Sequence, residues 1–237
     1  MIMIFRNILF YLGIIPATFI FGVLSCSLFF LPYPWRYWVT TRWSYFFVFW
    51  AKVTCGLSYH IQNPECLPKQ TAIVISNHQS AWETIFIQTL FPLQTWVLKK
   101  ELLLIPFFGW GLWLIRPIAI NRKQTHSIKI LLKDAETRLN EGSFVILFPE
   151  GTRVKPNQVK PFSRSFAALS KASHFPVVPI VHNAGLFWPK GPFIKKPGVI
   201  QVRIGPLIYP DNKTIEEIKE NGEKWIHEKS VQLSKLT

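Results

Sequence analysis

One short polar segment, residues 77–83, contains a histidine and a glutamate five positions apart. The segment directly follows an apolar run with the length of a strand, and the two residues are His78 and Glu83. A carboxylate that holds one imidazole nitrogen in its protonated form leaves the other nitrogen able to take a proton from a hydroxyl group. Ser80 and Glu83 also have the spacing of a helix capping box, in which the carboxylate only accepts hydrogen bonds from backbone N–H groups. The spacing leaves both interpretations open.

A second polar segment, residues 148–153, follows another apolar run. Gly151 permits a sharp turn or the close approach of a ligand, and Thr152 can donate a hydrogen bond. Arg153 can form a bidentate contact with a phosphate, and Glu150 can accept from a hydroxyl or hold the arginine. The alternative is a surface loop with an exposed ion pair, which contributes little stability. Arg122 ends a third apolar run, and on its own it indicates almost nothing.

Several other catalytic and binding motifs do not occur in the sequence. It contains no GxxxxGK[ST] loop, no GxGxxG after a strand, no GxSxG and no HExxH. The three cysteines lie far apart, which predicts neither a disulfide framework nor a zinc site and is typical of a reducing compartment. The other histidines lack metal-ligand spacing, so we expect them to be surface or packing residues. We expect no metal ion and no bound cofactor.

The elements that must position these segments alternate between strand-like and helix-like patterns. Six apolar runs predict strands, at residues 71–76, 95–98, 115–120, 143–148, 177–181 and 199–204. Helices are predicted over 128–139, with Gly142 as the stop, over 162–172, and from a capping box at Thr214 and Glu217 toward the C-terminus. This alternation predicts an α/β fold with a mostly parallel mixed sheet flanked by helices.

The N-terminal part of the chain is strongly apolar. Residues 8–31 form an uncharged run of 24 residues, and a helix of that length can cross a hydrocarbon core of about 30 Å. A second helix follows a turn at 31–34 and carries many tryptophan and tyrosine rings, which favour the headgroup region. We therefore expect a membrane-contact segment of two hydrophobic helices over 1–56 and a catalytic α/β domain over 57–237. A buried core helix is the alternative, and spanning or re-entrant insertion stays open.

The charge of the chain favours anionic partners. It has 27 Lys and Arg against 13 Asp and Glu, for a net charge of +14, with a mean hydropathy of +0.20. No acidic residue lies between Glu150 and Asp211, and we expect a basic surface there from Arg153, Lys155, Lys160, Arg164, Lys171, Lys190, Lys195, Lys196 and Arg203. Nucleic acid is the less favoured partner, since no nucleic-acid motif occurs. The cations that follow the apolar run place the large domain on the cytoplasmic side.

Together these segments resemble the glycerolipid acyltransferase family, and most closely the bacterial 1-acyl-sn-glycerol-3-phosphate acyltransferases. The family's first block matches residues 77–83, with Glu83 where the family usually has aspartate. Its second block ends in an arginine that Arg122 matches, its third matches residues 148–153 in full, and its fourth matches residues 178–180. The resemblance covers about residues 57–206, and its first and third blocks are the specific ones.

The resemblance implies transfer of an acyl chain from acyl-CoA or acyl-carrier protein to the free hydroxyl of 1-acyl-sn-glycerol 3-phosphate (lysophosphatidic acid), which gives phosphatidic acid. It implies that His78, oriented by Glu83, deprotonates this hydroxyl, and that Arg122 and residues 150–153 bind the glycerol phosphate. The implied reaction requires no metal. The resemblance also implies that the protein is located at the cytoplasmic membrane, where it meets anionic lipids. The alternatives are a sibling acyltransferase for another lyso-lipid and a non-catalytic membrane-bound protein that binds anionic lipids. The apolar run 102–114 lines an acyl-chain groove, touches the bilayer or belongs to the core.

Overall fold

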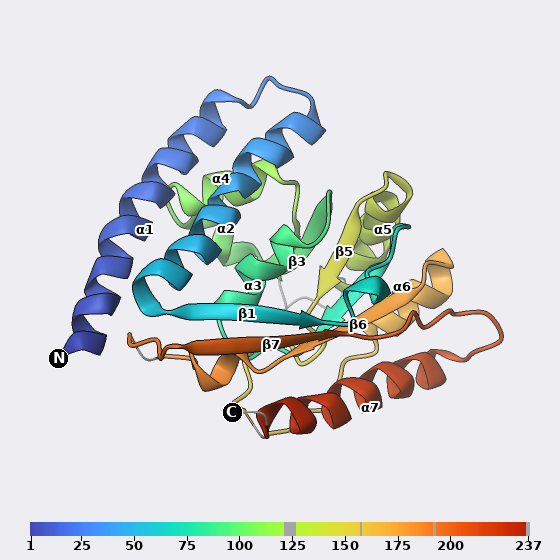
Figure 1. Cartoon of the computed structure of the whole chain (residues 1–237). Helices are drawn as coiled ribbons and strands as arrows, with labels where there is room; N and C mark the ends of the chain where they lie inside the picture. The colour runs from blue at the N-terminus through green and yellow to red at the C-terminus, as the bar shows by residue number, and fades with distance from the viewer. Residues whose placement is uncertain (121–126, 157, 192, 236–237) are drawn as a thin grey trace.

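The strands of the chain form one central sheet (Figure 1). The structure is a computed structural model that describes residues 1–120, 127–156, 158–191 and 193–235. In this part of the chain the strands are β1 (Leu57–Gln62), β2 (Ile73–Ser76), β3 (Gln94–Lys99), β4 (Ile118–Ile120), β5 (Phe144–Leu147), β6 (Val177–His182) and β7 (Gly198–Ile204). Their order is β1-β7-β6-β2-β5-β3-β4; β6 and β7 are antiparallel, and the other neighbours are parallel. The predicted mostly parallel mixed sheet is confirmed.

Helices cover both faces of this sheet. They are α1 (Ile2–Ser27), α2 (Tyr33–Cys55), α3 (Trp82–Phe86), α4 (Phe108–Leu114), α5 (Ser127–Asn140), α6 (Ser165–Ser173) and α7 (Ile215–Ser234). Short 3-10 helices lie at Pro64–Cys66, Ile87–Thr89, Lys100–Leu104 and Ala184–Leu186. The α1–α2 hairpin and α3 lie on one side of the sheet, and α7 lies on the other (Figure 1).

The central strands β2, β5 and β6 are buried at every position, because helices cover them on both sides. Side chains alternate between two apolar clusters along these strands. Val74 belongs to the cluster that contains Trp82 of α3 and Phe47 of α2. Its neighbour Ile73 belongs to the cluster formed with α5, α6 and α7, which contains Phe166. The continuous apolar runs in the sequence are therefore the signature of a sheet between two helical layers.

Several described elements differ from the predicted ones; the strand predicted over 115–120, for example, begins at Ile118, because α4 extends to Leu114 before it. The sheet has an additional edge strand, β1, which pairs with β7 alone. Polar and apolar residues alternate along this strand. The helix predicted from residue 162 begins at Ser165, because the N–H of Phe162 donates to Glu223 of α7 instead of continuing a helix. The capping box at Thr214 and Glu217 is confirmed, with both reciprocal hydrogen bonds present.

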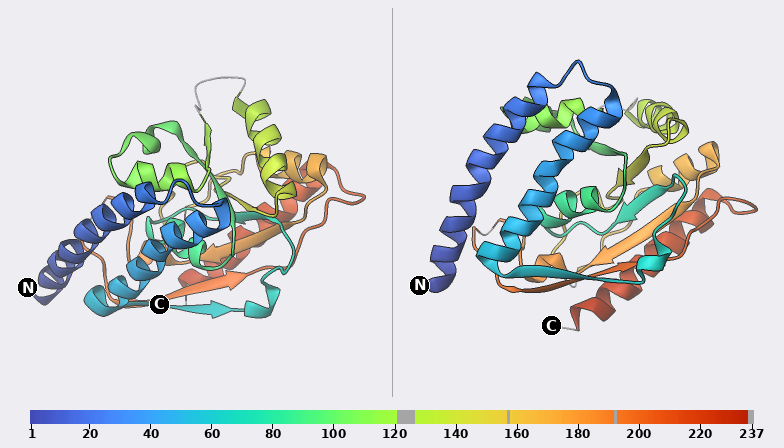
Figure 2. Two further views of the ribbon diagram at one scale, coloured as in Figure 1. Left: turned by 90° about the horizontal axis from the view of Figure 1, so that it is seen from above. Right: turned by 45° about the horizontal axis from the view of Figure 1, so that its top comes forward.

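The N-terminal helices α1 and α2 form an antiparallel hairpin (Figure 2). α1 covers residues 2–27 rather than 8–31, and α4 contacts both helices of the hairpin. Its outer face exposes large apolar side chains, among them Phe5, Leu12, Ile15, Phe19 and Ile20. Within the described residues α1 is the helix that is long and apolar enough to cross a membrane, and most of it is unburied. This exposure argues against a buried core helix.

Lys195 joins α1 to the segment before β7. Its ammonium group lies 4.4, 4.0 and 4.3 Å from the ring centroids of Phe10, Tyr11 and Trp188. The Asn7 side chain accepts from its backbone N–H at 2.8 Å and donates to its carbonyl at 3.2 Å. Burial lowers the pKa of Lys195 to about 8. The predicted basic surface is wrong at this position, because aromatic faces replace the water around a fully buried cation.

Candidate active site

The polar segments meet at the carboxyl ends of the central strands, because β2 lies between β5 and β6 and is parallel to both. Residues 77–83 follow β2, residues 148–153 follow β5, and His182 ends β6. In open α/β sheets, ligands bind in the crevice beyond the carboxyl ends of such strands. The topology therefore brings the first and third blocks of the sequence to one place.

His78 and Glu83 are in direct contact. His78 Nδ1 lies 2.7 Å from Glu83 Oε1; the histidine side chain is 18% exposed and the glutamate is fully buried. The same oxygen accepts backbone N–H bonds from Gln79 at 3.0 Å and Ser80 at 2.9 Å. Glu83 therefore orients the imidazole and also accepts from two backbone N–H groups just before α3. The predicted capping box is not formed, because the N-cap of α3 is Ala81 and the Ser80 hydroxyl accepts from the Trp82 N–H. The longer side chain of glutamate reaches the ring without loss of contact.

The neighbours of the buried Glu83 carboxyl group favour its ionised form. Burial alone raises its pKa, but His182, His78 and the Ser80 N–H stabilise the carboxylate and bring the pKa below its usual value. An ionised carboxylate beside Nδ1 keeps a proton on that nitrogen, and it also stabilises the positive charge that the ring gains when Nε2 takes a proton.

The segment after β5 holds His78 from a second direction. The His78 N–H donates to Glu150 Oε2 at 3.1 Å, and the Val154 N–H donates to the His78 carbonyl at 2.7 Å. The Phe148 ring stacks on the imidazole with centroids 4.2 Å apart and planes 16° apart. Thr152 and Arg153, which precede Val154, are exposed to solvent. The segment that contains these two residues, both able to bind an anion, therefore lies against the backbone of His78.

Glu150 is nearly buried, at 6% exposed. Burial raises its pKa to about 7; the His78 N–H and Lys160 oppose this rise, and the Glu83 charge adds to it. The turn that follows requires glycine, because Gly151 has a φ of 72°, in the left-handed region. Because its carboxylate accepts from the His78 N–H, Glu150 faces the backbone of the segment that contains His78. Arg122 lies outside the described residues.

Two cations at the end of β3 have no counterpart in the sequence-predicted site. β3 is parallel to β5, so its carboxyl end lies on the same side of the sheet as that of β5, and Lys99 and Lys100 are exposed there. Trp96 of β3 packs against Phe148, with ring centroids 5.8 Å apart, so the strand lies beside the ring that stacks on His78. A Lys-Lys pair directly after an apolar strand is the sequence signal for these residues.

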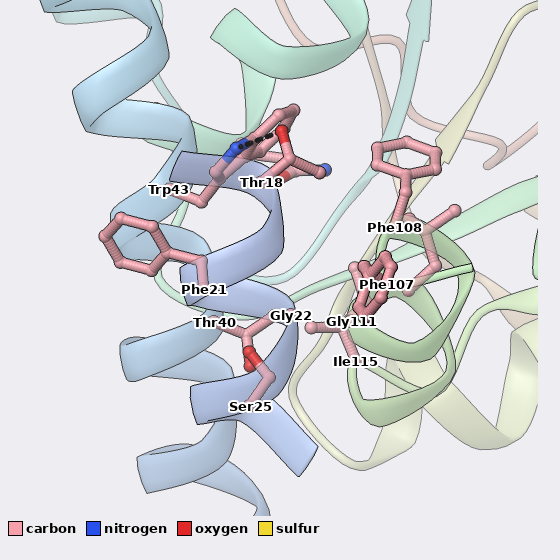
Figure 3. A pocket seen from close by; sticks show the side chains of 12 residues that line it. Thr18, Phe21, Gly22, Ser25, Thr40, Trp43, Phe107, Phe108, Gly111 and Ile115 are labelled. Atoms are coloured by element: carbon pink, nitrogen blue, oxygen red, sulfur yellow. Dashed lines mark hydrogen bonds between the residues drawn. The ribbon is translucent and has the colours of Figure 1, made fainter. Parts of the chain in front are cut away.

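Two cavities lie beside the N-terminal helices. The first, of about 40 Å³, lies between α1, α2 and α4, and the Trp43 Nε1 donates to Thr18 Oγ1 at 3.1 Å in its wall (Figure 3). The second, of about 430 Å³, is open and is lined by Phe29 and the tryptophans 110 and 113, among others. Both are mainly apolar, and residues of the run 102–114 line both. This run therefore provides space for apolar atoms on the side of the molecule that carries α1.

Comparisons with known proteins agree with this arrangement. The family model described as "Acyltransferase" matches residues 58–183, which contain both polar segments. A 1-acyl-sn-glycerol-3-phosphate acyltransferase from Pseudomonas aeruginosa is 39% identical, over 98% of this chain and 92% of that protein. A protein of the same name from Saccharomyces cerevisiae is 31% identical, over 79% of this chain and 62% of that protein.

A solved structure supports the fold. It is the crystal structure of PlsC, the 1-acyl-sn-glycerophosphate (LPA) acyltransferase from Thermotoga maritima, and it matches with a TM-score of 0.82. The match covers 98% of this chain and 96% of that one at 20% identity, so it shows a shared α/β architecture. With a family model over more than half of the chain and a relative matched along nearly its full length, this chain belongs to the acyltransferase family and is an acyltransferase.

Proposed function

We propose that this acyltransferase moves an acyl chain from an acyl thioester to the free hydroxyl of lysophosphatidic acid and so makes phosphatidic acid. The observation that carries the proposal is the 2.7 Å contact between His78 Nδ1 and the buried Glu83 carboxylate, beside an exposed arginine. The names of the relatives from P. aeruginosa and S. cerevisiae support this acceptor.

The reaction follows from the orientation of the imidazole. Glu83 holds Nδ1 in its protonated form, so Nε2 of His78 takes the proton as the acceptor hydroxyl attacks the thioester carbonyl. The carbon–sulfur bond then breaks, and the leaving thiolate receives the proton from Nε2. A general base of this kind contributes about 10² to 10⁴ in rate, and positioning of the two lipids supplies much of the rest. The scheme needs no covalent acyl-enzyme, metal or cofactor.

We assign the acceptor phosphate to exposed polar and cationic side chains that follow β5 and β3. Thr152 and Arg153 follow β5, Lys99 and Lys100 follow β3, and all four are exposed at the same edge of the sheet. An arginine guanidinium forms paired hydrogen bonds with phosphate oxygens, whereas lysines act as point charges. We also assign Arg122 to the acceptor phosphate, because it matches the arginine that ends the family's second block. Replacement of Arg153 by glutamine is expected to raise KM for lysophosphatidic acid more than it lowers kcat.

The exposed apolar face of α1 fits a bilayer, the source of the acceptor lipid. We propose that the α1–α2 hairpin attaches the enzyme to the cytoplasmic membrane, with the sheet on the cytoplasmic side, near anionic lipids. The exposed tryptophans of α4, 110 and 113, extend the apolar surface of this side. The acyl donor is a thioester of CoA or of the acidic acyl-carrier protein, and the exposed cations suit both.

A panel of acceptors tests the proposal. The full chain in detergent micelles receives oleoyl-CoA or oleoyl-acyl-carrier protein together with lysophosphatidic acid, lysophosphatidylcholine or monoacylglycerol, and released thiol and lipid product are measured. We expect kcat/KM to be at least about tenfold higher with lysophosphatidic acid, because the other two lack a free terminal phosphate. A higher value with another lyso-lipid identifies a sibling acyltransferase. Lipid binding without thiol release from either donor identifies a non-catalytic protein.

A further inference from the structure

His182 is a buried histidine behind the His78–Glu83 pair, and the proposed mechanism does not use it. It is the last residue of β6 and is 1% exposed. Because β6 and β2 are parallel neighbours, His182 lies beside the start of the segment that contains His78. Both ring nitrogens have polar partners there, which indicates a role beyond filling space in the core.

The neighbours of the His182 ring fix its tautomer. Nδ1 accepts a hydrogen bond from the Ala184 N–H at 3.2 Å, so this nitrogen carries no proton. Nε2 lies 3.0 Å from the carbonyl oxygen of Asn77, which can only accept, so Nε2 carries the proton. Burial lowers the pKa of His182, although the nearby Glu83 opposes this effect. The ring is therefore neutral, and its N–H points at Asn77.

This N–H holds the peptide group that leads into His78. The carbonyl of that peptide, from Asn77, accepts from His182, while its N–H, from His78, donates to Glu150. The Asn77 side chain adds two hydrogen bonds with the backbone of His182, at 2.9 and 3.1 Å. The peptide is thus fixed by β6 on one side and by the segment after β5 on the other.

The same N–H lies near the second oxygen of Glu83. Whereas Oε1 has three partners, Oε2 is buried and has no hydrogen-bond partner in the part of the chain that the structure describes. His182 Nε2 lies 3.9 Å from it. That distance is too long for a hydrogen bond, but the positive end of an N–H dipole stabilises a carboxylate at this range in a low-dielectric interior.

We propose that His182 is a positioning residue for the reaction: its Nε2–H fixes the Asn77–His78 peptide, and this nitrogen lies 3.9 Å from the Glu83 carboxylate. One ring thereby supports both members of the pair, the backbone of the histidine and the charge of the glutamate. The inference rests on the proposed function, because the orientation of His78 matters only when His78 takes the proton.

Two substitutions of similar shape test the role in the full chain. In His182→Gln the side-chain amide nitrogen takes the place of Nε2 and can still donate to Asn77. His182→Asn keeps an acceptor for the Ala184 N–H but loses that donor. We expect kcat with oleoyl-CoA and lysophosphatidic acid to fall about tenfold in His182→Asn and less than about threefold in His182→Gln, at unchanged KM. A role only as the acceptor of the Ala184 N–H predicts the opposite order in kcat. A role only in packing lowers the unfolding midpoint, more in His182→Asn because more volume is lost, and leaves kcat unchanged in both variants.

Asn183→Ala is the matched control for stability. The Asn183 side chain donates to the Leu233 carbonyl at 3.2 Å and accepts from the Gln201 N–H at 2.9 Å, away from His78. Its loss lowers the unfolding midpoint and leaves kcat unchanged. If both variants at position 182 keep the wild-type kcat while His78→Ala is inactive, the positioning role is wrong and the proposed function stands. If His78→Ala keeps its turnover, the proposed function itself fails.

The tautomer is measured in the unaltered protein, which keeps the inference testable if a variant does not fold. In protein with nitrogen-15-labelled histidine, we expect the ring nitrogens of His182 to show the neutral Nε2–H form at pH 7, since burial lowers the pKa of this ring. The titratable groups that face the ring are Glu83 on α3 and His78 after β2. A ring protonated on both nitrogens, or on Nδ1 alone, overturns the inference.

Discussion

Replacement of Glu83 by glutamine removes one charge and little else. The amide oxygen can still accept from the Gln79 and Ser80 N–H groups, so the start of α3 is retained. The imidazole, whose Nδ1 lies 2.7 Å from Oε1, loses its anionic partner. At an effective dielectric constant of about 20, two unit charges about 4 Å apart interact by about 4 kcal/mol. Since the ring is only partly charged in the transition state, about 2 to 4 kcal/mol is lost, and kcat falls about 30- to 1,000-fold.

Glu83→Asp separates charge from reach. The aspartate keeps the charge but is about 1.5 Å shorter, so it cannot contact the imidazole and both backbone N–H groups without a shift of the chain. We expect a smaller loss, of about tenfold, equivalent to about 1.4 kcal/mol.

Initial rates of thiol release from oleoyl-CoA in the presence of saturating lysophosphatidic acid measure both effects. Unfolding midpoints of the two variants provide the control for stability. A glutamine variant that turns over within about threefold of the wild type would refute the reasoning, because the carboxylate would then act only as an acceptor for the backbone N–H groups just before α3.

Three further predictions concern other parts of the molecule. Because burial raises the pKa of Glu150 to about 7, folding favours its protonated form; this stabilisation is complete below the unfolded pKa of about 4.5 and is lost as the pH rises through 7. Urea unfolding should therefore show Glu150→Gln gaining up to about 3 kcal/mol on the wild type between pH 4.5 and 8. In the interpretation that the run 102–114 lines an acyl-chain groove, Gly111→Val should shift the acyl-chain preference toward shorter donors, since a Cβ there meets only Thr40, at 3.7 Å, and Gly111 lines the first cavity. Gly109→Ala should mainly destabilise the fold, because its Cβ would meet the carbonyl oxygen of Leu103. Leu12→Glu, on the outer face of α1, should reduce co-flotation with anionic vesicles, and Val231→Glu on α7 should not; equal flotation of both would contradict attachment through α1.

The sequence predicts the central sheet well, because its buried strands are continuous apolar runs. β2, β5 and β6 lie between two helical layers, so nearly every side chain in them must be apolar. β1 cannot be predicted in the same way. It is an edge strand with polar residues at alternate positions, and its pairing with β7 depends on residues 141 positions further along the chain.

The site was predictable where its contacts are local. His78 and Glu83 lie five residues apart, and a strand end followed by a helix start brings them together. The contact between Asn77 and His182 spans 105 positions, and it exists only because β6 lies next to β2. Strand order cannot be read from strand propensity, so His182 resembles any other buried histidine in the sequence. The same holds for Lys195, which counts as a surface cation until α1 is placed against it.

The central claim is that Nε2 of His78 takes the proton of the acceptor hydroxyl. It is tested most directly by kcat of the His78→Ala variant with lysophosphatidic acid and oleoyl-CoA, with the unfolding midpoint and vesicle binding measured on the same protein. We predict a fall in kcat of about 10² to 10⁴, with the midpoint within about 3 °C of the wild type and vesicle binding retained. A folded, membrane-bound variant that still turns over within about threefold of the wild type would contradict the account.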